Sequence, residues 1–333
     1  MKIIIVGTGV MGITHANAIK DSEILSLVGF VGRNFEKTKK IAESFSTNAY
    51  TDIEEMLSKE DVDILDICLP TYLHEYAVSM AIKYKKHIMC EKPFTLSCSL
   101  AERLSNKAKN AGIRMMVLQV VRFWPEYVSI KNMIDKKVIG EIQNIYMNRL
   151  STYPKYSSWF RDPSKSGGGL YDLNIHDLDY LYYLFGEVKS VYATGQKSSK
   201  NSYDAVTANI VFVRGITATV ECNMDIKGEY PFTTCVRVIG ELGALEYNST
   251  SRYDDNFDNV KYNELILYLE DKKPNKIGVT QYNPYQKQME YFARCVLQDK
   301  DPEIINMNDV VYVLKMIKAI EKSLETNNVV FDI

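Results

Sequence analysis

Apolar runs of strand length alternate with helical repeats through the first third of the chain. Near-continuous apolar strands separated by helices are typical of a parallel sheet with helices on both faces. Residues 1–122 are therefore predicted to form a doubly wound α/β domain. The strand-like runs are KIIIVG (2–7), LSLVGFVG (25–32), VDILDICLP (62–70), KHIMCEKP (86–93) and RMMVLQV (114–120), with helical repeats over 10–20, 35–45, 72–84 and 96–112.

The pattern changes after residue 122, where strand-like stretches follow one another. Many of them alternate apolar and polar residues, as an antiparallel sheet with one covered face does. A helix is expected from about Leu170 to Phe185, and a closing amphipathic helix over 310–325. Residues 123–333 are thus predicted to form a second, α+β domain. Its strand-like stretches lie over 140–153, 189–198, 204–213, 215–225, 233–240, 243–248 and 264–269.

The first unit of the α/β pattern contains GTGVMG, in which Gly7, Gly9 and Gly12 match GxGxxG. The motif directly follows a predicted strand and opens a helix, which is the context that predicts a dinucleotide-binding Rossmann fold. Gly7 permits the tight turn, Gly9 lets the backbone approach a pyrophosphate, and Gly12 lets helix and strand pack closely. The phosphates would rest on the helix N-terminus at Val10 and Met11. An ordinary glycine turn is the alternative.

The end of the second strand distinguishes between nicotinamide cofactors. NAD-binding folds usually place Asp or Glu about 20 residues beyond the glycine loop to hold the ribose hydroxyls. Here the position is Gly32, followed by Arg33 and Asn34. A guanidinium can hold a 2′-phosphate bidentately, so the sequence favours NADP(H). Stacking of Arg33 on adenine would serve either cofactor, and NAD(H) stays open.

The strand over 86–91 ends in Cys90-Glu91-Lys92-Pro93. Ligands of an open parallel sheet bind at the carboxyl ends of its strands. A lysine there can donate to a substrate hydroxyl and favour its alkoxide, which lowers the barrier to hydride departure. The alternative makes Lys92 a solvated loop charge.

The segment GGGLYDLNIHDLDYLYYLFG (167–186) spaces Asp172 and His176 four residues apart. If the segment is α-helical, both side chains emerge on one face, one turn apart, beside a flexible glycine triplet. That arrangement suits an acid–base pair. In the alternative, the segment is an ordinary core helix, Asp172 complements the helix dipole and His176 is a surface histidine.

An aromatic cluster lies just before the glycine triplet: Tyr153, Tyr156, Trp159 and Phe160. Exposed aromatic rings can stack on sugar C–H faces, but a chain with 23 tyrosines makes core or interface packing the default.

Composition and charge exclude several classes of function. The formal net charge is −2 and acids and bases are interspersed, so we expect neither nucleic acid nor an anionic membrane as a partner. The apolar N-terminal run breaks at Gly7, so it is predicted to be a strand and not a signal peptide. No stretch reaches the roughly 18 uninterrupted apolar residues that a membrane span requires. Six scattered cysteines indicate reduced thiols in the cytoplasm. The four histidines have no ligand spacing, so no metal site is expected.

Taken together, these motifs resemble the family of glucose-fructose oxidoreductases and inositol dehydrogenases over nearly the full length of the chain. The resemblance implies a Rossmann domain followed by a domain with a large open sheet, through which members often form homodimers or homotetramers. The matching elements are GTGVMG, Pro70-Thr71 with His74, Glu91-Lys92-Pro93, Arg122-Phe123 with Pro125 and Tyr127, residues 138–142, and GGGLYDLNIHDLDYL.

The family's catalytic group corresponds to Lys92, Asp172 and His176. The resemblance implies that His176 takes the proton of a secondary hydroxyl, that Lys92 orients that hydroxyl, and that Asp172 holds a neighbouring hydroxyl or tunes the pair. It also implies cofactor contacts from Leu69, Pro70, Thr71, His74, Glu91 and Lys92, and substrate contacts from Arg122, Tyr153, Trp159 and the catalytic group.

The function expected from this resemblance is hydride transfer between a nicotinamide and a secondary hydroxyl or keto carbon of a sugar, inositol or related polyol. Two alternatives remain. One is a relative that cleaves glycosides while using its nicotinamide transiently, and the other is a non-enzymatic NAD(P)-binding sensor. No residue singles out one substrate.

Overall fold

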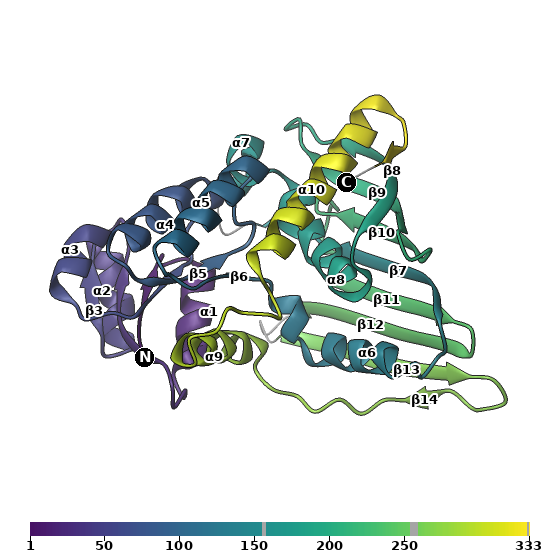
Figure 1. Cartoon of the computed structure of the whole chain (residues 1–333), viewed down its shortest axis with the longest axis horizontal. Coiled ribbons are helices and arrows are strands. Elements are labelled where there is room, and N and C mark those ends of the chain that lie inside the picture. The colour runs from purple at the N-terminus through teal and green to yellow at the C-terminus, as the bar shows by residue number, and fades with distance from the viewer. Residues whose placement is uncertain (155–157, 254–258, 332) are drawn as a thin grey trace. The chain divides into compact units, whose positions relative to one another are not determined.

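The computed structural model describes residues 1–154, 158–253, 259–331 and 333 (Figure 1). The chain divides into two compact units: residues 1–123 with 282–311, and residues 124–281 with 312–333. The first break lies next to the predicted boundary at 122. Segment 282–311, however, was assigned to the second domain by the sequence analysis and belongs to the first unit. Its helix packs on the first unit, where Ser22 donates a 2.8 Å hydrogen bond to Glu290.

The first unit contains a six-stranded parallel sheet with the strand order β3-β2-β1-β4-β5-β6. The order reverses between β1 and β4, which confirms the predicted doubly wound sheet. Ile3, Ile4 and Ile5 in β1 are fully buried, because helices cover both faces of the sheet. The strands are β1 (Lys2–Val6), β2 (Ser26–Val31), β3 (Asn48–Tyr50), β4 (Ile64–Ile67), β5 (His87–Glu91) and β6 (Met115–Leu118).

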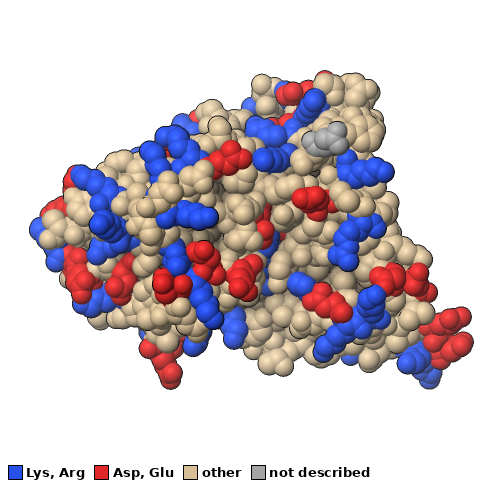
Figure 2. Space-filling view, viewed as in Figure 1, with Lys and Arg blue, Asp and Glu red and all other residues tan. Residues whose placement is uncertain are grey.

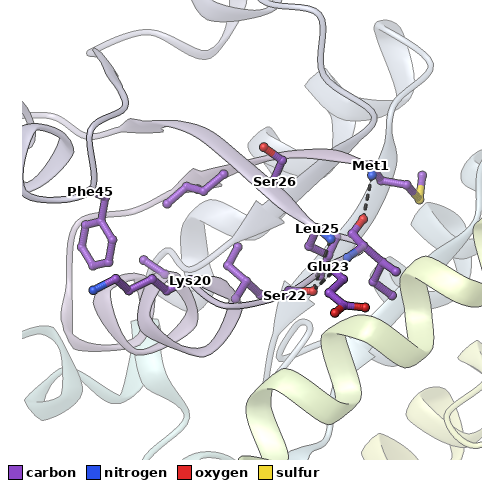
Figure 3. Close-up of a pocket in the computed structure, with 11 residues that line it drawn as sticks. Met1, Lys20, Ser22, Glu23, Leu25, Ser26 and Phe45 are labelled. Carbon is purple, nitrogen blue, oxygen red and sulfur yellow. Dashed lines mark hydrogen bonds between the residues drawn. The ribbon is translucent and has the colours of Figure 1, made fainter.

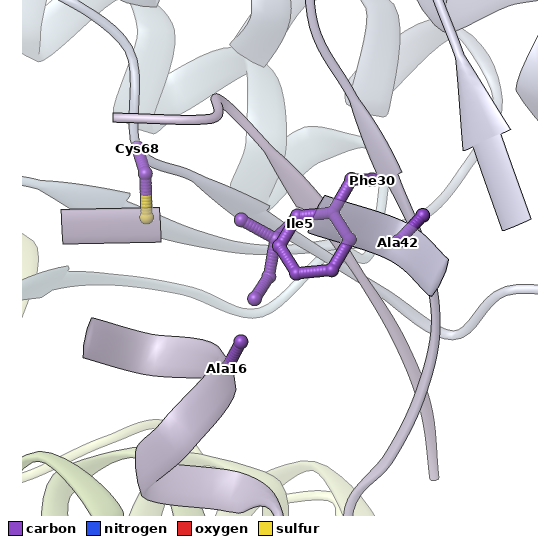
Figure 4. Close-up of a cluster of buried hydrophobic side chains, with 5 residues drawn as sticks. All are labelled: Ile5, Ala16, Phe30, Ala42 and Cys68. Atoms are coloured by element: carbon purple, nitrogen blue, oxygen red, sulfur yellow. The ribbon is translucent and has the colours of Figure 1, made fainter. Parts of the chain in front are cut away.

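Figure 1 draws α4 and α5 on one side of this sheet and α1 and α9 on the other. Small side chains let the helices approach the strands closely: Ala16 of α1 and Ala42 of α2 belong to one buried cluster with Ile5, Phe30 and Cys68 (Figure 4). The helices are α1 (Val10–Ile19), α2 (Phe35–Ser44), α3 (Ile53–Lys59), α4 (His74–Lys83), α5 (Cys98–Asn110) and α9 (Pro284–Leu297), with the 3₁₀ turns η1 (Thr71–Leu73) and η2 (Val120–Phe123).

The hydrophobic pattern of the sequence did not reveal β3, α3 or α9. β3 is only three residues long and lacks an apolar run, so periodicity could not reveal it. Both helices carry start signals that were available in the sequence. Asp52 caps α3 by accepting from the Glu55 amide, and Asn283 followed by Pro284 begins α9.

The second unit is built on a nine-stranded sheet with the order β14-β13-β12-β11-β7-β10-β9-β8-β15. Every neighbouring pair is antiparallel except β7 and β10, so the mostly antiparallel sheet is confirmed. The strands are β7 (Ile142–Leu150), β8 (Val188–Lys197), β9 (Tyr203–Phe212), β10 (Thr217–Asn223), β11 (Phe232–Gly240), β12 (Gly243–Tyr253), β13 (Asn259–Leu269), β14 (Asn275–Lys276) and β15 (Val330–Phe331).

Helices cover one face of this sheet. In β9 alternate residues are buried, which is the pattern of a sheet with one covered face. The predicted closing helix is α10, whose Tyr312 stacks on Tyr182 of α8 with ring centroids 4.5 Å apart. The helices are α6 (Pro125–Asp135), α7 (Pro163–Ser166), α8 (Ile175–Phe185) and α10 (Met307–Thr326), with the 3₁₀ turn η3 (Ser158–Arg161) and the π-helical turn η4 (Leu170–Asn174).

Positive and negative side chains are interspersed on the face drawn in Figure 2, in keeping with the net charge of −2. Within the described ranges, none of the helices has the length and apolar character needed to cross a membrane.

Candidate active site

The glycine loop after β1 has the geometry that a dinucleotide site needs. Gly7 has a φ of +130°, and a Cβ there would lie 2.3 Å from the Cys68 carbonyl oxygen. A Cβ on Gly12 would lie 2.1 Å from the Gly7 oxygen, so only glycine lets α1 pack this closely. A Cβ on Gly9 would meet nothing within 4 Å. The backbone at Gly9 is therefore open to a ligand, at the N-terminus of α1.

The first turn of α1 is accessible next to this loop. Val10 is 50% exposed and Met11 is half-buried. These two residues are the predicted phosphate-binding positions, and a bound pyrophosphate could reach their amides without rearrangement of the helix.

At the end of β2, the structure explains why no acid stands at position 32. Gly32 is buried, and a Cβ there would lie 2.5 Å from Thr38 Oγ1 and 2.8 Å from Thr8 Cγ2. The next residue, Arg33, is exposed. Asn34, predicted to contact the cofactor, uses its side-chain oxygen to cap α2 by accepting from the Lys37 amide at 3.0 Å.

The loops after β4 and β5 are joined by His74. Its ring lies between two carbonyl oxygens, with Nε2 2.8 Å from Leu69 O and Nδ1 3.1 Å from Phe94 O. Burial lowers the pKa of His74, so the neutral ring donates to one of these carbonyls at a time. His74, predicted as a cofactor contact, thus ties together the two loops that carry Pro70 and Lys92.

Thr71 begins η1 directly after Pro70. Its side chain is 5% exposed, and its hydroxyl has no hydrogen-bond partner among the described residues. Leu69 and Pro70 beside it are half-buried. A buried hydroxyl without a partner is costly unless a ligand or water satisfies it, so Thr71 fits a polar group of a bound dinucleotide.

At the end of β5, Glu91 is 7% exposed and its carboxylate is engaged inside the first unit. Glu91 Oε2 accepts from the Lys92 amide at 3.1 Å, and Oε1 lies 3.1 Å from His15 Nε2. Lys92 itself is half-buried and joined to Pro93 by a cis peptide bond. The carboxyl ends of β1, β2, β4 and β5 thus bring the predicted cofactor residues to one edge of the sheet.

In the second unit, the glycine triplet sets the start of the helix that carries Asp172 and His176. Gly167 and Gly168 have φ values of +76° and +73°, and a Cβ on Gly168 would lie 2.6 Å from Ser202 Cβ. The Gly169 amide donates to Asp204 Oδ1 at 2.8 Å. Side chains would not fit here, so the triplet is required by conformation and close approach.

The helix that follows differs from the predicted α-helix over Leu170–Phe185. Its first part, Leu170–Asn174, is π-helical, and α8 begins at Ile175. Because a π-turn is wider than an α-turn, Asp172 and His176 depart from the one-turn spacing on a single helix face that the sequence predicted. π-turns inside helices are frequent at functional sites.

Exposure nevertheless separates these two side chains from the others in the stretch 168–181. From Gly168 to Leu181, every residue is buried except Asp172 and His176, which are half-buried. They are therefore the positions of this stretch that a ligand can reach.

Behind the pair, a buried ion pair anchors α8 to the sheet. Arg149 of β7 donates to Asp177 at 2.7 and 3.2 Å, and to the Tyr127 hydroxyl at 3.2 Å. Arg149 and Asp177 are 1% and 0% exposed. Burial raises the pKa of Asp177 while Arg149 opposes that rise, and burial raises the pKa of Tyr127 to about 12. This pair fixes the residue next to His176.

Sequence reasoning missed this ion pair, although one signal was present. Along β7 the buried positions are Ile145, Met147 and Arg149. A charged residue in register with two apolar core residues indicates a buried partner of opposite charge.

Arg122, predicted to bind substrate, lies inside the first unit. It is 3% exposed, and Nη1 donates to Asp309 Oδ2 at 2.7 Å and to the Ile304 carbonyl at 2.5 Å. Both acceptors belong to segment 282–311 of the same unit. Arg122 therefore has the environment of a structural ion pair in the protein interior.

The aromatic cluster is mostly packed. Tyr153 is 9% exposed, its hydroxyl donates to the Phe160 carbonyl, and Lys200 Nζ lies 4.1 Å from its ring centroid. Burial raises the pKa of Tyr153 to about 12. Trp159 is half-buried and stacks on Phe160, with centroids 4.1 Å apart. Tyr156 lies outside the described residues.

A pocket of about 360 Å³ opens in the first unit, at the opposite edge of the sheet from the glycine loop (Figure 3). Met1, Ser26 and Leu27 line it at the amino ends of β1 and β2, together with Lys20 just after α1. Because ligands of doubly wound sheets bind at the carboxyl ends, this pocket is separate from the candidate site.

Comparison with known protein families identifies both units. Residues 1–119 match a model described as an oxidoreductase family with an NAD-binding Rossmann fold, and residues 127–246 match the C-terminal domain model of the same family, GFO/IDH/MocA. The chain belongs to the Gfo/Idh/MocA family of oxidoreductases. As a family member it is an oxidoreductase with a nicotinamide dinucleotide as cofactor.

Among relatives of this Gfo/Idh/MocA protein is a myo-inositol 2-dehydrogenase of Thermotoga maritima, 25% identical over 98% of this chain and 96% of the relative. The aldose-aldose oxidoreductase structure of Caulobacter crescentus, complexed with glycerol, has a TM-score of 0.87 and 21% identity, covering 100% of this chain and 99% of the other. A 3-ketoreductase of Actinomadura kijaniata, in complex with NADP and TDP-benzene, has a TM-score of 0.85 and 19% identity, with coverage of 97% and 98%.

The Arg149–Asp177 pair generates a stability prediction. Asp177→Ala leaves a buried guanidinium without its carboxylate and should lower the free energy of unfolding by about 3–5 kcal/mol. The double variant Arg149→Met with Asp177→Leu should lose much less, because no unpaired charge remains. Urea denaturation of the three proteins measures this. Equal losses in the single and the double variant would contradict the pairing.

Proposed function

We propose that this protein is a dehydrogenase or reductase that acts on a secondary hydroxyl or keto carbon of a sugar, inositol or related polyol. The observation that carries the proposal is the accessibility of Asp172 and His176 on a helix whose neighbouring residues are buried. The relatives named as a myo-inositol 2-dehydrogenase and an aldose-aldose oxidoreductase support the same substrate class. Family membership supplies the redox chemistry.

In the proposed reaction, three side chains divide the work. The bound nicotinamide supplies the site that takes or gives the hydride. His176 accepts the proton of the substrate hydroxyl during oxidation and returns it during reduction. Lys92 donates to the same oxygen and stabilises its negative charge, because an ammonium favours the alkoxide. Asp172 holds a neighbouring hydroxyl or tunes this pair.

Lys92→Ala and His176→Ala should each lower kcat by about 10²–10⁴-fold, because each removes a group that acts on the proton or the charge of the transition state. The affinity for the reduced cofactor should change little. Steady-state kinetics on a panel of polyols and keto-sugars, combined with fluorescence titration of cofactor, measure both. His87→Gln is the matched control, because His87 begins the strand that Lys92 follows and its Nδ1 accepts from the Arg114 amide at 3.1 Å.

Other outcomes of this screen decide between the remaining functions. Full activity of both variants would show that the catalytic assignment is wrong. Hydrolysis of glycosides without net cofactor turnover would identify the glycoside-cleaving alternative. Cofactor binding without turnover of any compound would identify a sensor.

We also infer that the preferred cofactor is NADP(H). The crowding of position 32 by Thr8 and Thr38 excludes an acidic side chain there, and the exposed Arg33 next to it supports recognition of a 2′-phosphate. NAD(H) would have no carboxylate at this position to hold its ribose.

Arg33→Ala should weaken NADPH binding about 10- to 100-fold, which is the effect of losing hydrogen bonds to a charged group, and NADH binding much less. Titration of both reduced cofactors against wild type and variant measures the difference. Lys40→Ala, an exposed cation on α2, is the control. Tighter binding of NADH than of NADPH by the wild type would overturn the inference.

The assembly is proposed to be a homodimer or homotetramer formed through the nine-stranded sheet, in a reducing, cytoplasmic setting. Large apolar side chains on its strands are partly exposed, among them Ile239, Tyr262 and Tyr268. All six cysteines are free thiols. Sedimentation of wild type and Ile239→Lys should show an oligomer that weakens in the variant, and a monomeric wild type would contradict it.

A further inference from the structure

A buried cluster of ionisable side chains lies behind the glycine loop in the first unit, and the proposed reaction uses none of its inner members. His15 of α1 and Asp66 of β4 are both fully buried, and Glu91 at the end of β5 is 7% exposed. Burying three such groups is costly unless they are paired, so their arrangement requires an explanation.

The imidazole of His15 faces a carboxylate on each side. Nδ1 lies 2.8 Å from Asp66 Oδ2 and Nε2 lies 3.1 Å from Glu91 Oε1. A neutral imidazole has one N–H and can donate to only one of them, whereas an imidazolium donates from both nitrogens. Only Nδ1 makes a hydrogen bond, because Nε2 has no hydrogen-bond partner among the described residues and contacts Glu91 as an ion pair at 3.1 Å. A ring with a carboxylate oxygen near each nitrogen favours the charged imidazolium.

Electrostatics support this protonation state. Burial by itself would lower the pKa of His15, but Asp66 raises that pKa well above its ordinary value of 6.5. The other groups facing the ring are Glu91 and Tyr285 of α9, whose ring centroid is 5.8 Å away. Burial raises the pKa of Cys68, so this neighbour stays a neutral thiol.

A metal ion does not explain the cluster. The His15, Asp66 and Cys68 ligand atoms lie within 4.8 Å of one another. However, ligand atoms at about 2.0 Å from a tetrahedral zinc are roughly 3.3 Å apart. The 2.8 Å between His15 Nδ1 and Asp66 Oδ2 is a hydrogen-bond distance with a proton between the atoms.

Glu91 extends the network to the candidate lysine. While Oε1 faces His15, Oε2 accepts from the Lys92 backbone amide at 3.1 Å. The chain of contacts therefore runs from Asp66 through His15 and Glu91 to the backbone of Lys92. It connects α1, which begins at the glycine loop, with the strand end that presents the lysine.

We propose that His15 is a positioning residue: as an imidazolium held between Asp66 and Glu91, it orients Glu91 and thereby sets the backbone from which Lys92 acts. The catalytic part of this inference rests on the proposed function of Lys92, but the charged state of His15 does not. Substituting His15 would release Glu91 and leave two buried carboxylates facing each other without a cation.

The protonation state has its own measurement. In a ¹⁵N–¹H spectrum of the wild-type imidazoles, both nitrogens of His15 should remain protonated at pH 7, where an ordinary histidine is mostly neutral. Burial and Arg114 lower the pKa of His87, so the same spectrum contains a neutral reference ring. The chain has four histidines, so Gln variants of the other three assign the His15 signal by elimination even if His15→Gln does not fold. A His15 ring with one protonated nitrogen at pH 7, or a bound metal ion, overturns the proposal.

The free energy of unfolding should depend on pH through the protonation of His15. Because the pKa of His15 in the folded state lies above the ordinary 6.5, the stabilisation it contributes is fully present below pH 6.5 and is lost as pH rises through the folded value. His15→Gln should remove this alkaline loss from the pH profile of the unfolding midpoint. A wild-type profile identical to that of the variant contradicts the charged pair.

The positioning role is tested by a double-variant cycle. His15→Gln and Glu91→Gln should each lower kcat by about tenfold or more, as misplacement of a reacting group does, with a smaller change in the KM for substrate. The double variant should be no slower than either single variant, because all three lose the same contact between His15 and Glu91. Asn17→Ala, an exposed position on the same helix, is the control.

The outcomes separate the two proposals. Unchanged kcat in His15→Gln, or multiplying defects in the double variant, overturns the positioning role even if the ring is charged. If wild type turns over no polyol or keto-sugar, the proposed function fails, and the imidazole spectrum and stability profile still decide whether the Asp66–His15–Glu91 network exists.

Discussion

Buried charge is the constraint on which this structure depends most. Each unit contains an arginine or histidine that is almost fully buried, and each of these cations contacts a carboxylate within 3.2 Å. Burying an ion without a partner would cost several kcal/mol, so these pairs restrict how their elements can pack. Arg149 with Asp177 holds α8 against β7, and His15 with Asp66 and Glu91 holds α1 against β4 and β5.

The pairs lie directly behind the residues to which we assign chemistry. Asp177 follows His176 in the sequence, and Glu91 precedes Lys92. In both places a buried carboxylate is held by a buried cation while the next side chain reaches a more accessible surface. A rigid interior pair thus supports a reactive neighbour, which is how a scaffold limits the motion of a catalytic group.

Glycines form the second constraint. Gly7 leaves room for the Cys68 carbonyl, and Gly12 lets the helix α1 approach the end of β1. Gly32 leaves room between Thr8 and Thr38, and Gly168 leaves room beside Ser202. At each of these positions a side chain would collide with neighbouring atoms. Backbone is consequently exposed to ligand at Gly9, while acidic side chains are excluded from the end of β2. The same lack of side chains shapes the cofactor preference that we propose.

By itself, the sequence determined the parallel and antiparallel sheets, the order of most elements, the glycine loop and the family, because periodicity and turn chemistry are local. Only the tertiary structure showed that residues 282–311 join the first unit and that Leu170–Asn174 forms a π-turn. Only the tertiary structure also showed that Arg122 forms an ion pair in the interior. It also decided the pairs Arg149–Asp177 and His15–Asp66, which are 28 and 51 residues apart in sequence. A local sequence pattern cannot identify such partners, because only the packing of the folded chain determines which buried charges contact each other.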